Sequence, residues 1–231
     1  MNRNLTAFCA AMFACALLFA FCGALWIDNS AFSLADTHEN NIKTVYLTFD
    51  DGPSDRVTPK ILDVLKEENV KATFFVIGNQ AQTRKYLLKR EADEGHKIGV
   101  HSYSHKYKEI YSSCENLIDD IDKCNAVIKS ATGKYSDIYR FPGGSFNLSG
   151  KYISAVAKHG LRYIDWNAST RDAEILKATP EQLFNAAVTT AANADNIVLL
   201  AHDSTTKTAT ADALKDIIRH FKSKGYEFSK F

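Results

Sequence analysis

Apolar segments as long as buried strands alternate along this chain with segments of helical periodicity. No other feature of the sequence restricts the fold as much. We expect strands at residues 44–49, 72–78, 95–100, 138–142, 161–166 and 197–201, and a seventh around Phe228. We expect helices at residues 59–68, 85–94, 152–159, 180–192 and 212–224, and another that begins after Ser112 or Ser113. This order predicts an α/β fold with a parallel sheet and outer helices, either a barrel or a doubly wound sheet.

The length of the chain favours one of these two architectures. Roughly 190 residues follow residue 43, slightly fewer than a complete eightfold barrel uses. We therefore expect a distorted or incomplete (β/α) barrel of parallel strands, formed by a single domain at residues 43–231. The net charge of +1, without a basic block, predicts no nucleic-acid partner. We expect a monomer.

The first part of the chain has a different composition. Arg3 precedes an uncharged, largely apolar run at residues 5–27, which is long enough to span a bilayer with some tilt. We expect residues 1–27 to be a membrane anchor and residues 28–42 a linker. A cleaved signal segment is the alternative, because Ser33-Leu34-Ala35 offers a small-residue cleavage site. Either reading predicts an extracytoplasmic domain, anchored to the membrane or secreted.

Polar residues that could take part in catalysis or metal binding follow several predicted strands. Asp50 and Asp51 end the first strand, and Gly52-Pro53 then turns the chain. Adjacent side chains on a strand point in opposite directions, so these two carboxylates suit different tasks. His101 and His105, four residues apart after the third strand, can hold one divalent metal together with Asp51. Two histidines and one carboxylate leave positions open for water and substrate, as a catalytic metal requires.

Two further residues at strand ends have both a structural and a functional reading. Arg140 is either a surface residue or a buried guanidinium that needs a carboxylate partner. His202 follows a wholly apolar strand, and it is either structural or a general acid.

Five motifs in this order resemble those of a known family. They are TFDDGP at residues 48–53, ATFFVIG at 72–78, GHKIGVHSYSH at 95–105, RFPGGS at 140–145 and IVLLAHD at 197–203. The chain is similar to polysaccharide deacetylases of carbohydrate esterase family 4, the group of chitooligosaccharide and peptidoglycan N-acetylglucosamine deacetylases. The resemblance covers about residues 43–228.

The resemblance implies roles for the polar residues. Asp50 would be the general base that activates water, Arg140 would orient Asp50, and His202 would be the general acid that protonates the leaving amine. A divalent metal, zinc or alternatively cobalt or another divalent ion, would bind the ligands Asp51, His101 and His105.

The resemblance also implies a substrate groove. Pro142 and Gly143 would form one wall, Leu200 would line the pocket for the acetyl methyl group, and Trp166 would contact the sugar. Alignment on Trp166 gives His202 the partner Asp172, with Asp165 as a rival. Ala173 stands where relatives have a groove-lining Trp, so the groove is expected to be more open here.

The resemblance implies metal-dependent hydrolysis of N-acetyl groups on an amino-sugar polymer. Peptidoglycan is preferred over chitin-like oligomers because the domain is expected beside the cell wall. An O-acetyl esterase with the same site is one alternative. A carbohydrate-binding relative that has lost turnover is another.

Overall fold

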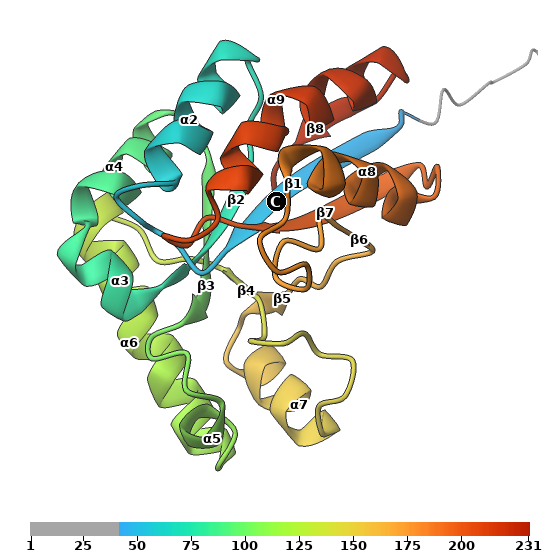
Figure 1. The fold of residues 1–231 in the computed structure, drawn as a ribbon. Helices are drawn as coiled ribbons and strands as arrows, with labels where there is room; N and C mark the ends of the chain where they lie inside the picture. Colours follow the sequence, from blue (N-terminus) through green and yellow to red (C-terminus); the bar gives the residue numbers. More distant parts are fainter. Residues whose placement is uncertain (1–41) are drawn as a thin grey trace, which may run out of the picture. The chain divides into compact units, whose positions relative to one another are not determined.

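Residues 42–231 are described by a computed structural model, and strands alternate with helices throughout them (Figure 1). The strands are β1 (Thr44–Asp50), β2 (Thr73–Ile77), β3 (Lys97–Ser102), β4 (Ile138–Tyr139), β5 (Arg162–Tyr163), β6 (Ala168–Ser169), β7 (Asn196–His202) and β8 (Glu227–Ser229). The helices are α2 (Thr58–Glu67), α3 (Gly78–Thr83), α4 (Lys85–Asp93), α5 (Tyr107–Ile110), α6 (Cys114–Thr132), α7 (Gly150–Lys158), α8 (Pro180–Ala191) and α9 (Thr208–Ser223).

The strands form one parallel sheet with β1 near its centre. The order is β5-β4-β3-β2-β1-β7-β6, and β8 also pairs with β1. One edge of β1 pairs with β7 along its whole length, whereas the other edge pairs first with β8 and then with β2. The end strands β5 and β6 do not pair with each other in this part of the chain. The helices lie outside the curved sheet (Figure 1), so the expected distorted, incomplete (β/α) barrel is confirmed.

The core lies between the central strands and the helices that cover them. All five residues of β2 are buried, and so are alternate residues Val45, Leu47 and Phe49 of β1. From α2, Ile61 and Leu65 pack into the same cluster. Burial of each such side chain contributes about 1.5–3 kcal/mol relative to exposure. The paired strands are therefore a rigid base for the residues at their ends.

Local capping signals explain where the longer helices begin. Ser113 is the N-cap of α6, and its side chain accepts a hydrogen bond from the Asn116 N–H. Thr179 and Gln182 form a capping box at the start of α8, which satisfies two N–H groups that the helix leaves unpaired. Helix α6 ends at Gly133, whose φ of 81° suits a residue without a Cβ.

The structure corrects several predicted boundaries. The fourth strand stops at Tyr139 and does not reach Pro142, which has no N–H to pair with a neighbouring strand. Two left-handed glycines, Gly143 and Gly144, follow. His101 lies within β3 and does not begin a loop. The short elements α3, α5 and β6 were not predicted, since they have only six, four and two residues.

No helix within residues 42–231 is long and apolar enough to cross a membrane. The predicted anchor at residues 1–27 and the predicted linker, apart from Ile42, lie outside the described residues.

Candidate metal centre and active site

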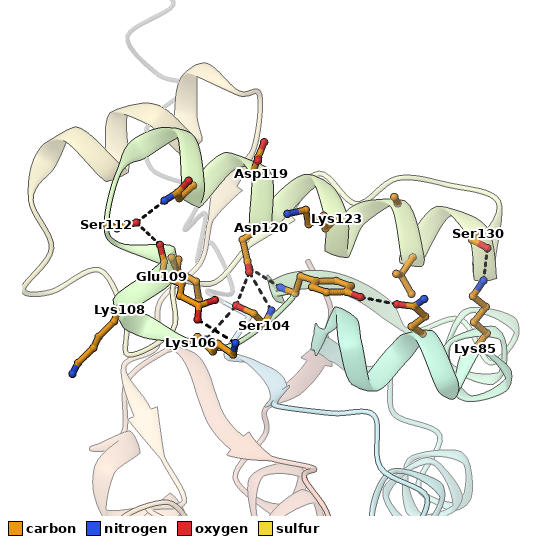
Figure 2. Close-up of a pocket in the computed structure, with 16 residues that line it drawn as sticks. Lys85, Ser104, Lys106, Lys108, Glu109, Ser112, Asp119, Asp120, Lys123 and Ser130 are labelled. Atoms are coloured by element: carbon orange, nitrogen blue, oxygen red, sulfur yellow. Dashed lines mark hydrogen bonds and ion pairs between the residues drawn. The ribbon is translucent and has the colours of Figure 1, made fainter.

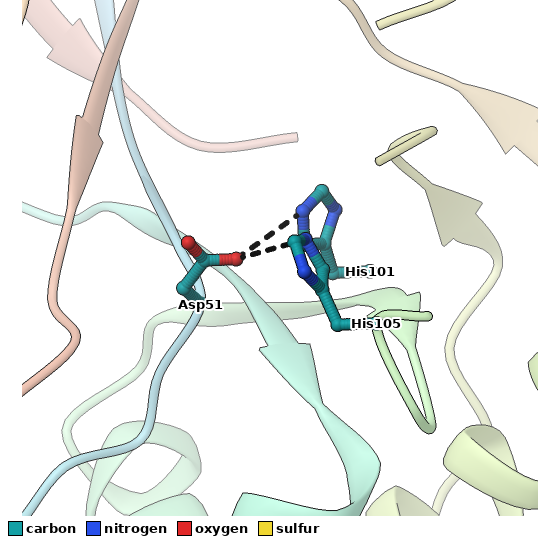
Figure 3. Close-up of side chains that lie close together, drawn as sticks. All are labelled: Asp51, His101 and His105. Carbon is teal, nitrogen blue, oxygen red and sulfur yellow. Dashed lines mark ion pairs between the residues drawn. The ribbon is translucent and has the colours of Figure 1, made fainter. Parts of the chain in front are cut away.

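Asp51, His101 and His105 converge at the carboxyl edge of the sheet (Figure 3). The Asp51 Oδ1 atom lies 3.5 Å from His101 Nε2 and 3.3 Å from His105 Nε2. One ligand atom from each residue lies within 4.8 Å of the other two. The Asp51 Oδ1 atom is buried and accepts no hydrogen bond in the described residues. A buried acceptor between two imidazole nitrogens fits a divalent cation, which would satisfy all three groups.

The backbone at two of these ligands is strained. Asp51 has a φ of 71° and His105 a φ of 56°, a region that residues other than glycine rarely adopt. The left-handed turn at Asp51 ends the strand alternation that β1 follows up to Asp50. Strain of this kind collects at binding sites, where the surrounding structure holds it in place.

His101 is prepared to bind a metal through one nitrogen. Its Nδ1 lies 2.9 Å from the backbone oxygen of Arg140, so Nδ1 carries the proton and Nε2 presents its lone pair towards Asp51. Burial lowers the pKa of His101 to about 3. The imidazole is therefore neutral at ordinary pH, as metal ligation requires.

Asp120 of α6 holds the loop that carries His105 (Figure 2). Its carboxylate accepts hydrogen bonds from the Tyr103 N–H at 2.6 Å, the Ser104 N–H at 3.1 Å and the Ser104 hydroxyl at 2.8 Å. The His105 N–H donates to the Ser102 hydroxyl at 2.6 Å. Asp120 was not predicted from the sequence, because no local pattern shows that a helix residue reaches this loop.

A groove of about 1130 Å³ lies beside the same loop and is separate from the metal ligands. Residues of α3, α5 and α6 line it, together with Tyr103 and Ser104 (Figure 2). Asp51, His101 and His105 do not line this groove.

Asp50 is buried beside the ligand set and paired with a buried arginine. The Arg140 Nη1 atom donates to Asp50 Oδ1 at 2.9 Å and to Thr48 Oγ1 at 2.8 Å. The Arg140 guanidinium also packs 4.3 Å from the centroid of the Phe75 ring. Burial raises the pKa of Asp50, although the charges of Arg140 and His202 oppose this rise. Arg140 is fully buried, which excludes the surface reading of this residue.

His202 forms a hydrogen-bonded pair with Asp172. Asp172 Oδ1 lies 2.7 Å from His202 Nδ1, and Asp172 Oδ2 accepts from the His202 N–H at 2.8 Å. Burial by itself would lower the pKa of His202, but the hydrogen bond and charge of Asp172 outweigh it and raise the pKa to about 9. Asp165, the rival partner, instead accepts hydrogen bonds from the N–H and hydroxyl of Ser145.

The predicted groove residues lie around this group. The Pro142 carbonyl accepts a hydrogen bond from the Tyr111 hydroxyl at 2.9 Å, and Gly143 has a φ of 81°. Leu200 is buried on β7. The Trp166 ring centroid lies 5.6 Å from the Arg140 guanidinium carbon.

Two aromatic residues beside the site were not singled out from the sequence. The Tyr107 ring lies edge-on to His105, with centroids 5.3 Å apart. Burial, followed by the charges of Asp51 and Asp50, raises the pKa of the Tyr107 phenol. The Phe146 ring lies edge-on to Trp166 at 5.4 Å. Aromatic residues occur along the whole sequence, so none of these positions could be recognised by type alone.

Asp203 supports the turn after the aspartate pair. Its carboxylate accepts from the Thr58 hydroxyl at 2.5 Å, and its carbonyl accepts from the Ser54 hydroxyl at 2.6 Å. A Cβ added at Gly52 would lie 2.1 Å from Asp203 Oδ2. Only glycine therefore fits at position 52 without a clash with this buried carboxylate.

Residues 37–164 match the sequence family described as Polysaccharide deacetylase. The chain is 35% identical over 200 residues to the peptidoglycan-N-acetylmuramic acid deacetylase PdaA of Bacillus subtilis. This alignment covers 86% of this chain and 72% of PdaA. The chain is 37% identical over 189 residues to the peptidoglycan-N-acetylglucosamine deacetylase PgdA of Listeria monocytogenes. That alignment covers 80% of this chain but only 37% of PgdA. The chain therefore spans little more than a third of the length of PgdA.

Solved structures share the fold. The catalytic domain of peptidoglycan N-acetylglucosamine deacetylase from Eubacterium rectale has a TM-score of 0.77 and 37% identity, covering 87% of this chain and 94% of that chain. BA3943 of Bacillus anthracis, described as a CE4 family pseudoenzyme, has a TM-score of 0.73 and 26% identity. The superposition covers 83% of this chain and 64% of the BA3943 chain.

An incomplete (β/α) barrel with an Asp-His-His group at the carboxyl edge of its strands defines a hydrolase with a candidate site for a divalent metal. The chain belongs to the polysaccharide deacetylase family, carbohydrate esterase family 4, and is close to peptidoglycan deacetylases.

Proposed function

We propose that this protein removes N-acetyl groups from the amino sugars of peptidoglycan. The observation that carries the proposal is the arrangement around Asp51, His101 and His105. A carboxylate held by an arginine and a histidine held by a carboxylate lie beside one ligand set. A divalent ion bound there would polarise the acyl oxygen and activate water.

Asp50 and His202 divide the proton transfers of this hydrolysis. Asp50, oriented by Arg140, takes a proton from the attacking water, and its raised pKa makes it a stronger base. The water oxygen bonds to the acyl carbon, and the C–N bond then breaks. His202, protonated near neutral pH because of Asp172, gives its proton to the departing nitrogen. The products are a free amine and acetate.

The state of His202 favours an amide over an ester substrate. An amine is a poor leaving group unless its nitrogen is protonated, whereas an alkoxide depends less on an acid. A pKa of about 9 keeps His202 in the form that donates a proton. O-acetyl ester hydrolysis uses the same residues and is measured as the competing activity.

The ligand set supports zinc as the metal. Two imidazole nitrogens and one carboxylate oxygen match a catalytic zinc site with positions left open. Cobalt accepts the same ligands, so metal content is measured on protein purified without added ions.

The choice of peptidoglycan is supported by the relatives and by the expected export of the domain. PdaA is a deacetylase of N-acetylmuramic acid and PgdA of N-acetylglucosamine, both in peptidoglycan, and the chain is 35% and 37% identical to them. Similarity therefore favours the polymer over chitin-like oligomers and does not select the sugar. We propose an extracytoplasmic enzyme that residues 1–27 anchor to the membrane or direct to secretion.

The pseudoenzyme BA3943 shows that this fold can persist without turnover. The ligands, the base and the acid are all in place here, which argues against a silent carbohydrate-binding protein.

The proposal is tested by acetate release from peptidoglycan fragments and from N-acetylglucosamine oligomers, with acetylated xylan as the ester comparison. We expect acetate from the amide substrates, its loss in excess chelator and its return with zinc. Mass spectrometry of the treated fragments would identify the sugar. Release of acetate that persists in excess chelator, or release from the ester alone, contradicts the proposal.

A further inference from the structure

Tyr107 begins the short helix α5, two residues after the ligand His105. Its ring lies edge-on to the His105 imidazole, and 46% of the residue is exposed. Burial, followed by the charges of Asp51 and Asp50, raises the pKa of its phenol. Tyr107 therefore borders the ligand His105, with one side open to an incoming substrate.

The phenol of Tyr107 also fills the space beside the Pro142–Gly143 turn. A Cβ added to Gly143 would lie 3.2 Å from Tyr107 Cε1 and 3.4 Å from the Tyr107 hydroxyl. Gly143 has a φ of 81°, and this conformation directs its missing side chain at the phenol. The Tyr107 hydroxyl is thus a close neighbour of the Gly143 backbone.

One contact ties the end of α5 to this turn, and a second contact within the helix supports the Tyr107 ring. The Tyr111 hydroxyl donates to the Pro142 carbonyl at 2.9 Å. The Tyr111 ring lies edge-on to Tyr107, with centroids 6.1 Å apart. The phenol of Tyr107 is therefore held in place and needs no rearrangement to act at the turn.

The Tyr107 hydroxyl and the Gly143 N–H are both available as donors. The Gly144 N–H donates to the Phe141 carbonyl at 2.8 Å, whereas the Gly143 N–H has no such partner within residues 42–231. Within the same residues, the Tyr107 hydroxyl has no hydrogen-bond partner. An oxyanion site requires donors near the place where negative charge develops, and these two free donors lie next to each other beside the ligand His105.

We propose that Tyr107 is a catalytic residue whose hydroxyl donates a hydrogen bond to the acyl oxygen of the substrate as that oxygen gains charge, beside the Gly143 N–H. This inference rests on the proposed function. It adds a side-chain donor from α5 to the base, acid and metal ligands. The bond forms fully only when the acyl carbon becomes tetrahedral, so it accelerates turnover more than it strengthens binding of the substrate.

The test compares Tyr107→Phe with wild type, using Tyr135→Phe as the matched control. Tyr135 is 61% exposed and packs under Lys129 of α6, so it is a surface tyrosine of the same chemistry. We expect Tyr107→Phe to lower kcat on N-acetylglucosamine oligomers about 10²-fold, as loss of one oxyanion donor does. The control variant keeps wild-type kcat. Zinc affinity, measured by titration, stays the same in all three proteins.

A second measurement separates a catalytic role from substrate binding. Asp50→Asn binds the oligomer without turning it over, and adding Tyr107→Phe to this variant is expected to leave the oligomer Kd unchanged within about twofold. If the Kd instead weakens by the same factor as kcat/KM, Tyr107 binds the ground state and the inference is wrong. A weaker zinc affinity in Tyr107→Phe would also overturn it, because the residue would then only support the ligand loop.

A third measurement does not depend on turnover. A methylphosphonamidate of glucosamine carries a tetrahedral centre with a charged oxygen, and zinc-loaded Tyr107→Phe is expected to bind it at least tenfold more weakly than wild type. Equal affinities refute the oxyanion role. Wild-type protein that releases no acetate would refute the proposed function, while the phosphonamidate comparison would still decide the role of Tyr107.

Discussion

Asp50 and Asp51 are neighbours in the chain but have different surroundings. Asp50 is the last residue of β1, is buried and pairs with Arg140. Asp51 leaves the strand with a φ of 71° and turns its carboxylate towards His101 and His105. The alternation of side chains on a strand predicted that the two would separate. The left-handed turn directs the Asp51 carboxylate at the histidines, and no sequence pattern predicted this turn.

Asp50→Asn is expected to remove turnover and to keep the metal. The amide cannot accept a proton from water, so kcat is expected to fall by about 10²–10⁴-fold, the contribution of one general base. Asn retains an oxygen that can accept from Arg140, which limits the structural damage. Acetate release and zinc content are measured on the same sample. Loss of zinc from this variant would mean that Asp50 is a ligand and that the two roles are exchanged.

The pH profile of turnover is expected to depend on Asp172. His202 must be protonated to act as the acid, and its pKa of about 9 places the alkaline loss of activity near that pH. Asp172→Asn removes the charge that raises this pKa, so activity is expected to be lost at lower pH, at or below the ordinary histidine value of 6.5. Asp165→Asn is the control and keeps the alkaline limb of the profile in place.

The raised pKa of His202 also makes the stability of the protein depend on pH. The folded-state pKa of His202 is raised, so this residue stabilises the protein fully below pH 6.5, and the contribution is lost as pH rises through about 9.

The activity profile also tests the role of His202. If Asp172→Asn leaves the alkaline limb of the pH–activity profile unchanged, another group is the acid.

At the scale of elements, periodicity and capping residues located the longer helices and the central strands. Ser113 was one of two predicted caps for α6 and is the cap in the structure. Elements of two to six residues, such as α5 and β6, are too short to show a period. The choice between Asp165 and Asp172 as the partner of His202 depended on one of these short elements, β6. Because β6 pairs with β7, with Ser169 beside Leu200, the chain after β6 brings Asp172 to His202.

Helix α6 positions the metal-ligand loop through Asp120. Asp120→Asn replaces one acceptor oxygen with an NH₂ group that faces the N–H donors of Tyr103 and Ser104. We expect zinc affinity to fall about 10–100-fold, as it does when an outer partner of a ligand is lost. Asp119→Asn is the control, one residue away on the same helix and exposed. Zinc titration checks both, and equal affinities would show that the loop holds its shape without Asp120.

At the scale of the whole molecule, the sheet assembles the site from distant segments. Asp50 is directly opposite His202 in the β1–β7 register, although 152 positions separate the two residues in the sequence. Strand β3 adds His101, and the segment after β4 adds Arg140. The alternation of strands and helices predicted that these ends would meet at one edge. The distances, the pairing of partners and the side chains that α5 and α6 contribute depend on packing between segments, which a single sequence does not display.

Because the metal ligands come from segments that meet only in the folded chain, zinc is expected to stabilise the whole protein. An unfolded chain separates Asp51 from the two histidines by about 50 residues, so zinc binds the native state far better. At free zinc of 100 times its Kd, the free energy of unfolding is expected to rise by about 2.7 kcal/mol. Denaturant midpoints with zinc and with chelator measure this difference. His105→Ala should abolish the zinc-dependent shift, whereas His159→Ala, at the end of α7, should retain it. An equal shift in both variants would place the stabilising zinc at another site.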